Sequence, residues 1–297
     1  MRTFLSRLTL ILCCTSTLAH AETNPTWTTS IAPFRISDNL YYVGSQDLAS
    51  YLVVTPEGNI LINANLATSP PQIRASVEKL GFRWKDTWAL LNSQAHFDHM
   101  GGAAEVIRET HALNVVMDGD VSVVESGART DFLSPSPNIS TYSPVHVDRV
   151  LQDEDTVRLG DVTLTAHKTA GHTRGCTTWT MRSHLPGEPA GTMRNIVIVG
   201  GTGFWSEYHF VATAGHAASY PGIVQDFQHT FAVLRGLHCD VFLGAHGGYF
   251  DMLKKLEHYP QDGPRVFIDP AGYKDFVTEA QGTFEQALSK EQQPTVR

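Results

Sequence analysis

The sequence lacks several features that would place it in other classes of protein. It has no strongly basic stretch: 22 Lys and Arg stand against 30 Asp and Glu, and the formal net charge is -8. Nucleic acid is therefore not an expected partner. No internal repeat or linker is visible, and 42% of the 297 residues are hydrophobic. This composition favours one well-buried globular domain, with two small domains sharing a core as the alternative.

Apolar runs long enough to span a membrane are also missing, since the only early one, Leu8 through Leu18, is short. It follows two basic residues, Arg2 and Arg7, and precedes the small-x-small sequence Ala19-His20-Ala21. This pattern is typical of a cleaved signal peptide. We therefore predict a signal peptide over residues 1–21 and a periplasmic mature domain over residues 22–297. A membrane anchor is the less favoured alternative.

Cysteine is scarce, and two of the four cysteines, Cys13 and Cys14, fall within the predicted signal peptide. A lipoprotein signal is disfavoured because Leu12, rather than a small residue, precedes Cys13. The mature domain would keep only Cys176 and Cys239, which allow one disulfide or two buried free thiols. The sequence leaves this choice open.

Short apolar runs separated by turn residues predict a strand-rich first part and interleaved helices after it. Strands are expected at 40–43, 50–54, 59–62, 88–91, 115–117, 157–159, 162–166, 177–181, 195–199 and 241–243. Helical spacing is expected at 72–80, 102–111, 225–237 and 273–288. The order predicts an α+β layered fold with two sheets inside and helices outside. Residues 126–144, rich in Ser, Pro and Asn, predict a long loop, and such loops tend to be functional.

The strongest chemical signal is the segment His96-Phe97-Asp98-His99, which directly follows a predicted buried strand. Imidazole and carboxylate groups at this spacing are zinc ligand types. In a loop, His96 would face one way and Asp98 with His99 another. One metal could hardly use all three without strain, whereas two adjacent metals could.

Two further histidines occur in matching contexts. His172 lies in Ala170-Gly171-His172-Thr173 and His246 in Gly244-Ala245-His246-Gly247, each shortly after a predicted strand. Loops at the same ends of strands converge in a layered sheet fold, and the neighbouring glycines allow close backbone approach. A metal site is therefore predicted where these loops meet. His and Asp ligation favours zinc, with iron or manganese left open.

These motifs together resemble the metallo-β-lactamase superfamily, and most of all the third subclass of metallo-β-lactamases. The resemblance runs from the early predicted hairpin through His-x-Asp-His and Gly-His-Thr to the final Ala-His, and includes Tyr220-Pro221 before the helix at 225–237. It implies a four-layer αββα sandwich with the active site at one edge between the two sheets.

The resemblance also implies two zinc ions per chain and a ligand set for each. The ligands of the first would be Gln94, His96 and His172, and those of the second would be Asp98, His99 and His246. Most of the family has histidine where this chain has Gln94; a minority branch has glutamine. A neutral amide is a weaker ligand than imidazole, so the first site is expected to bind zinc more weakly.

The reaction expected from such a site is hydrolysis of the strained β-lactam amide of penicillins, cephalosporins and carbapenems, which would confer antibiotic resistance. Zinc-bound water loses its proton near neutral pH and becomes a nucleophile, and Asp98 would orient it. Many lactonases, thioesterases and nucleases of the superfamily carry a bridging aspartate after the strand expected at 195–199. Gly200-Gly201-Thr202-Gly203 contains none. That absence favours a lactamase over a lactonase or thioesterase; a non-catalytic zinc-binding protein is the other alternative.

Contacts with the small-molecule substrate are predicted from the resemblance alone. Trp27, Phe132 and Ile139 would form apolar walls of the cleft, and Thr202 would contact the substrate carboxylate. Asn63, where many relatives have aspartate, is interpreted either as a hydrogen-bonding support for the metal ligands or as a simple turn residue. A monomer is expected.

Overall fold

The computed structural model describes residues 24–293. The predicted signal peptide, residues 1–21, lies outside the described residues. Two sheets form the interior. The first has seven strands: β1 (Phe34–Arg35), β2 (Leu40–Tyr42), β3 (Tyr51–Thr55), β4 (Gly58–Ile62), β5 (Thr87–Leu91), β6 (Leu113–Met117) and β7 (Arg149–Leu151). The second has five: β8 (Thr156–Leu159), β9 (Val162–Lys168), β10 (Thr177–Ser183), β11 (Arg194–Val199) and β12 (Val241–Gly244), in the order β12-β11-β10-β9-β8.

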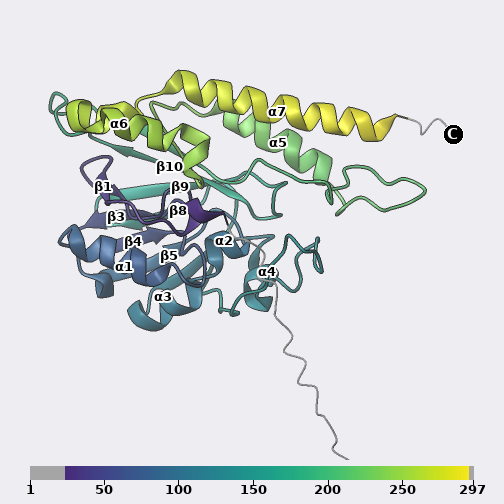
Figure 1. The fold of residues 1–297 in the computed structure, drawn as a ribbon, viewed down its shortest axis with the longest axis horizontal. Coiled ribbons are helices and arrows are strands. Elements are labelled where there is room, and N and C mark those ends of the chain that lie inside the picture. Colours follow the sequence, from purple (N-terminus) through teal and green to yellow (C-terminus); the bar gives the residue numbers. More distant parts are fainter. Residues whose placement is uncertain (1–23, 294–297) are drawn as a thin grey trace, which may run out of the picture.

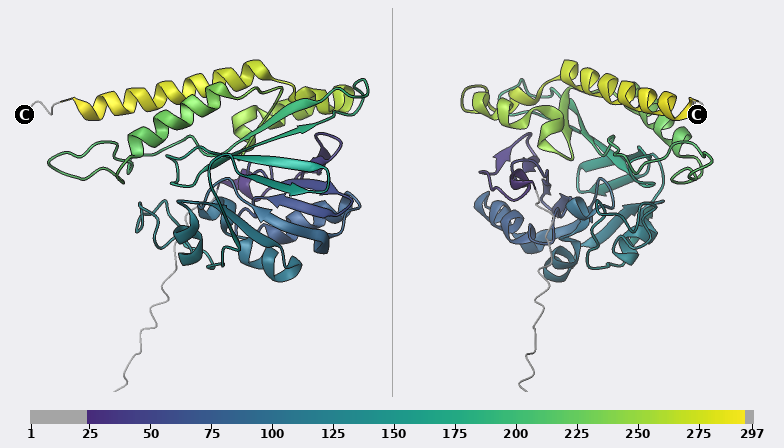
Figure 2. Two further views of the ribbon diagram at one scale, coloured as in Figure 1. Left: turned by 180° about the vertical axis from the view of Figure 1, so that it is seen from behind. Right: turned by 45° about the vertical axis from the view of Figure 1, so that its right-hand side comes forward.

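Helices cover the outer face of each sheet, which gives the four layers seen in Figure 1 and, from two further directions, in Figure 2. Beside the first sheet lie α1 (Pro70–Lys79), α2 (Phe97–Met100), α3 (Ala103–Thr110) and α4 (Val121–Ser126). Beside the second lie α5 (Ile223–Gly236), α6 (Met252–Asp262) and α7 (Pro270–Gln292). Short 3-10 turns occur at Pro25–Trp27, Trp84–Asp86, Gly247–Phe250 and Gly263–Phe267. The predicted αββα architecture is confirmed.

Alternation along the strands explains why the first sheet is covered on both faces. In β4, Ile60 and Ile62 point into the core between the sheets, whereas Leu61 joins the core beneath the helices. The same division holds in β6, where Val115 and Val116 go to opposite faces. Successive strand side chains alternate between faces, so a continuously apolar strand must be buried on both sides.

The outer helices bury one apolar stripe each. In α5, Phe227, Phe231 and Leu234 are buried, as their helical spacing predicts. Phe227 stacks on Phe284 of α7 with ring centroids 4.9 Å apart, which fixes the two helices against each other. A hydrogen bond across the core joins the two sheets: the indole N–H of Trp179 in β10 donates to the carbonyl of Asn92, which follows β5, at 2.9 Å.

Several local features differ from the sequence predictions. The sequence patterns do not predict helices α4 and α6 or strands β1 and β7, and His96-Phe97-Asp98-His99 is not a loop. His96 caps the short helix α2, which carries Asp98 and His99 in its first turn. The long loop predicted at residues 126–144 is confirmed in position. It follows helix α4, which ends at Ser126.

Two other observations bear on the expectations. Both cysteines of the described residues, Cys176 and Cys239, are buried free thiols rather than a disulfide. Among residues 24–293, no helix has the length and apolar character needed to cross a membrane.

Candidate metal centre

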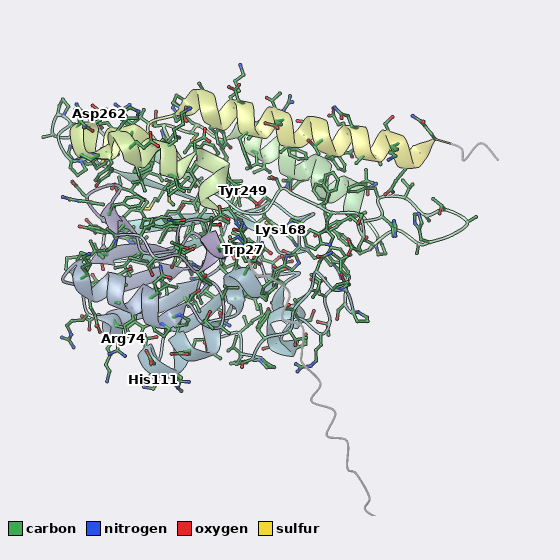
Figure 3. The ribbon with its side chains drawn as sticks, in the orientation of Figure 1. Trp27, Arg74, His111, Lys168, Tyr249 and Asp262 are labelled. Carbon is green, nitrogen blue, oxygen red and sulfur yellow. The ribbon has the colours of Figure 1, made fainter. Side chains whose placement is uncertain are left out.

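The predicted ligands gather at one edge of the sandwich because each follows the end of a strand. Gln94, His96, Asp98 and His99 come after β5, His172 after β9 and His246 directly after β12. In Figure 3, the labelled Trp27 and Tyr249 lie between the two helical layers; both rings contact that of His246, with centroids 6.0 and 5.3 Å away. Arg74 and His111 mark the remote outer face.

One group of ligand atoms is formed by His96 and His172. Nδ1 of His96 and Nε2 of His172 are 3.2 Å apart, and both side chains are buried. Burial and the neighbouring His96 lower the pKa of His172 to about 3, which keeps its imidazole neutral. A neutral imidazole is the form that binds a metal ion.

A second group is formed by Asp98, His99 and His246. Oδ2 of Asp98 lies 3.3 Å from Nε2 of His99 and 3.5 Å from Nε2 of His246. One ligand atom from each residue falls within 4.8 Å of the others, a spacing that could hold a metal ion. Burial acts to raise the pKa of Asp98, but His99 and His246 outweigh burial and hold it well below its usual value. Asp98 is therefore an anion.

The two groups are neighbours rather than separate sites. The charges of Asp98 and His99 act on the pKa of His172, and the charge of His96 acts on that of His99. The structure thus brings His96, Asp98, His99, His172 and His246 together, as the sequence predicted.

Gln94 and Asn63 hold the backbone near the ligands. Oε1 of Gln94, which is 1% exposed, accepts a hydrogen bond from the backbone N–H of His96 at 3.3 Å. Asn63 has a left-handed backbone with φ 69°. Its Oδ1 accepts from the backbone N–H of Ser93 at 2.8 Å and its Nδ2 donates to the carbonyl of Ala49 at 3.2 Å. Asn63 thus braces Ser93, the residue before Gln94.

Asp47, which the sequence analysis did not identify, orients His246. Its Oδ2 accepts hydrogen bonds from Nδ1 of His246 at 2.9 Å and from the indole of Trp27 at 3.0 Å. An isolated bridge between Leu48 and His246 holds the two segments together. Because Nδ1 is occupied, Nε2 of His246 is left facing Asp98. Asp47 and His246 are 199 residues apart, so no local pattern could have revealed the pair.

His172 is held by a separate set of contacts. Its Nδ1 donates to the carbonyl of Gly203 at 2.7 Å, and its own carbonyl accepts from the hydroxyl of Tyr208 at 2.6 Å. The next turn is fixed by Asp120, which accepts from Oγ1 of Thr173 and from the backbone N–H of Gly175, both at 2.8 Å. Burial raises the pKa of Asp120 to about 6. Sequence reasoning missed Asp120 because its partners lie more than fifty residues further along the chain.

The residues predicted to contact substrate lie in different surroundings. The ring of Trp27 lies against Phe97 at the edge of the site, with centroids 6.2 Å apart. Phe132 packs on Tyr208 and Tyr220. Ile139 is 8% exposed and belongs to the core beneath the helices, and Thr202 is 5% exposed. Substrate contact by these residues stays a prediction; for Ile139 the observed role is packing.

Unsatisfied buried atoms support the presence of a bound ion. Among the described residues, Nδ1 and Nε2 of His99 and Nε2 of His96 are buried without a hydrogen-bond partner. Buried polar atoms normally have partners, so orphaned imidazole nitrogens beside a carboxylate fit a cation that would use some of them. The donor set therefore fits a metal centre.

The pKa of His246 gives a pH-dependent prediction. Burial lowers this pKa, but hydrogen bonds with Asp47 and Asp98 outweigh burial and raise it to about 9. Below pH 9 the metal-free imidazole is protonated, and a metal ion must displace that proton. Below pH 9, each unit by which the pH is lowered should therefore reduce the metal affinity of the Asp98–His99–His246 group by about tenfold through this proton alone.

Calorimetric metal titration at pH 8, in buffers of different ionisation enthalpy, counts the protons released. Asp47→Asn removes a carboxylate that raises the pKa of His246, so this variant should release fewer protons. An unchanged proton count would contradict the assignment.

Comparison with known proteins identifies the family. The model of the metallo-β-lactamase superfamily matches residues 48–184. The native FEZ-1 metallo-β-lactamase from Legionella gormanii is 43% identical, with a TM-score of 0.84, over 90% of this chain and 98% of that one. The chain therefore belongs to the metallo-β-lactamase superfamily.

Other similar structures point to the predicted subclass. The metallo-β-lactamase GOB-18 from Elizabethkingia meningoseptica is 33% identical, with a TM-score of 0.81, over 91% of this chain and 97% of that one. LRA-12, described as a class B3 di-zinc metallo-β-lactamase from an Alaskan soil metagenome, is 33% identical, with a TM-score of 0.78, over 90% and 98%. The resemblance to the third subclass is confirmed.

Proposed function

We propose that this chain is a periplasmic zinc enzyme that hydrolyses the amide bond of β-lactam antibiotics, penicillins, cephalosporins and carbapenems among them, and so confers resistance. The observation that carries the proposal is the cluster of four imidazoles and one anionic carboxylate at the sheet edge, in a chain 43% identical to a metallo-β-lactamase over nearly its whole length. The predicted signal peptide supports export.

The residues that would hold zinc divide into two sets. Gln94, His96 and His172 would hold one ion, and Asp98, His99 and His246 the other. Bound zinc supplies Lewis-acid chemistry, because it polarises a carbonyl and lowers the pKa of water. Every histidine of the two sets has a nitrogen that is free of a carbonyl partner.

Asp98 is the residue proposed to orient the attacking water. Its carboxylate is ionised and buried, so it accepts a hydrogen bond and fixes the direction of an O–H group. His99 and His246 stand on either side of Oδ2, which limits how the carboxylate can turn.

Two indole rings flank the ligands. Trp27 lies 6.0 Å from the ring of His246, and Trp205 lies 5.7 Å from the rings of both His96 and His172. Apolar walls of this kind exclude water and strengthen the electrostatic interactions within a site. A compact bicyclic substrate would rest against these rings.

The test is hydrolysis of a penicillin, a cephalosporin and a carbapenem by the purified mature protein, before and after chelation and with zinc added back. We expect turnover that chelation abolishes and zinc restores. A folded, zinc-loaded protein that cleaves a lactone or thioester but no β-lactam would establish a lactonase or thioesterase instead of a β-lactamase. Zinc binding without any hydrolysis would establish a binding protein.

Gln94 gives a prediction about the first zinc site. Replacing its weak amide ligand with imidazole, in Gln94→His, should tighten zinc binding at the Gln94–His96–His172 site by about ten- to a hundredfold. A zinc titration against a competing chelator measures this. Gln286→His, at an exposed position of α7, is the matched control. Equal affinity in Gln94→His and the parent would show that Gln94 is no ligand.

A further inference from the structure

Asp131 is a buried carboxylate with no assigned role. Its side chain is 1% exposed, and Oδ2 lies 3.5 Å from Nε2 of His96. Both atoms are buried and have no hydrogen-bond partner. The other oxygen, Oδ1, accepts from the backbone N–H of Leu133 at 2.8 Å, which fixes the carboxylate in this direction. A buried carboxylate oxygen without a partner is costly, so its alignment on an imidazole calls for an explanation.

The protonation of His172 limits what His96 can do. Nδ1 of His172 faces a carbonyl, which only accepts, so this nitrogen carries the proton. A neutral imidazole has one N–H and one bare nitrogen, so Nε2 of His172 has the bare lone pair. Nδ1 of His96 faces that lone pair at 3.2 Å. If His96 carries its proton on Nδ1, it donates to His172; if on Nε2, two bare nitrogens face each other.

Asp131 favours the second arrangement. At 3.5 Å its carboxylate acts on His96 mainly through charge, and a negative charge favours a proton on the nearer nitrogen, Nε2. Nδ1 of His96 and Nε2 of His172 then face each other without a proton. Their lone pairs repel each other when no cation is present, and both can bind a cation placed between them.

The loop that carries Asp131 supports the same segment at a second point. Its Tyr142 donates a hydrogen bond from the hydroxyl to the carbonyl of Ala95 at 2.6 Å. Tyr142 and Ile139 are buried in the core beneath the helices, which anchors this end of the loop. The loop at 126–144 thus holds both the backbone before His96 and the far side of its ring.

We propose that Asp131 is a positioning residue that keeps the proton of His96 on Nε2 and so presents Nδ1 to the metal ion of the Gln94–His96–His172 group. The proposal rests on the proposed ligand set but not on the substrate. It assigns Asp131 the part that Asp47 has toward His246 in the other group. Such carboxylates typically contribute about ten- to a hundredfold to metal affinity.

The first measurement is the histidine tautomer in the metal-free, full mature protein, by nitrogen NMR with 15N-labelled histidine. We expect His96 in the Nε2–H form and His172 in the Nδ1–H form. In Asp131→Asn, the carbonyl oxygen can still accept from Leu133, while the amide nitrogen donates toward Nε2 of His96. The proton of His96 should therefore move to Nδ1. An Nδ1–H tautomer in the parent would overturn the proposal, even if the variant does not fold.

The second measurement is cobalt(II) affinity, followed by its visible spectrum, in a His246→Ala background that leaves the Gln94–His96–His172 group. Asp131→Asn should weaken binding by about ten- to a hundredfold. Asp86→Asn, which changes a half-exposed aspartate paired with Arg83, should leave binding unchanged. Equal losses in both variants, or no loss in Asp131→Asn, would refute the proposal. No β-lactam is used, so failure of the proposed reaction would be seen separately.

Discussion

Asp98→Asn should lower kcat/KM for a cephalosporin by about a thousandfold, the range expected when an oriented proton-accepting group is lost. The carboxylate lies beside Nε2 of both His99 and His246, and it is ionised despite being buried. An amide has nearly the same shape but no charge, so it binds a cation weakly and cannot take a proton. The variant should also retain less zinc, which metal analysis of the purified protein would measure.

Asp86→Asn is the matched control for Asp98→Asn. Asp86 is a half-exposed aspartate paired with Arg83 at 3.5 Å, remote from the ligands, and its replacement should change neither activity nor zinc content. If Asp98→Asn kept parental kcat/KM with full zinc, Asp98 would have no role in the reaction.

Gly201→Ala should disrupt the first metal site through packing alone. A Cβ atom at Gly201 would lie 2.3 Å from Cδ2 and 3.0 Å from Cβ of His172. The imidazole cannot swing aside, because its Nδ1 is bound to the carbonyl of Gly203. We expect the free energy of unfolding to fall by about 1–3 kcal/mol. Zinc affinity at the first site should fall by about tenfold or more, because a misplaced ligand costs metal affinity.

Gly203→Ala provides the control two residues away. A Cβ atom there meets nothing within 4 Å, and the carbonyl that binds His172 is unchanged. Denaturant unfolding and zinc titration of the two variants should therefore differ clearly. If both variants matched the parent, the close contact between Gly201 and His172 would not be a constraint on the site.

The layered fold was predictable because the spacing of apolar residues within each segment indicates which faces of that segment are buried. The runs around Ile60 and Val115 are apolar on both faces, and the stripe of Phe227, Phe231 and Leu234 recurs at helical spacing. Helices α4 and α6 were not predicted from the sequence. Helix α4 is only six residues long, and α6 has few buried side chains and contains Pro260. Proline inside a helix is disfavoured, so its presence argues against a helix in the sequence.

The sequence by itself determined the ligand types, since His96, Asp98 and His99 stand close together and His172 and His246 follow strands. Only the tertiary structure decided which groups orient them. Asp47 lies 199 residues from His246, and Asp131 meets His96 across a loop without regular secondary structure. Ligand spacing is a property of a short segment and is visible in it. An orienting contact joins segments that meet only when the sheets pack together, and no local pattern encodes that distance.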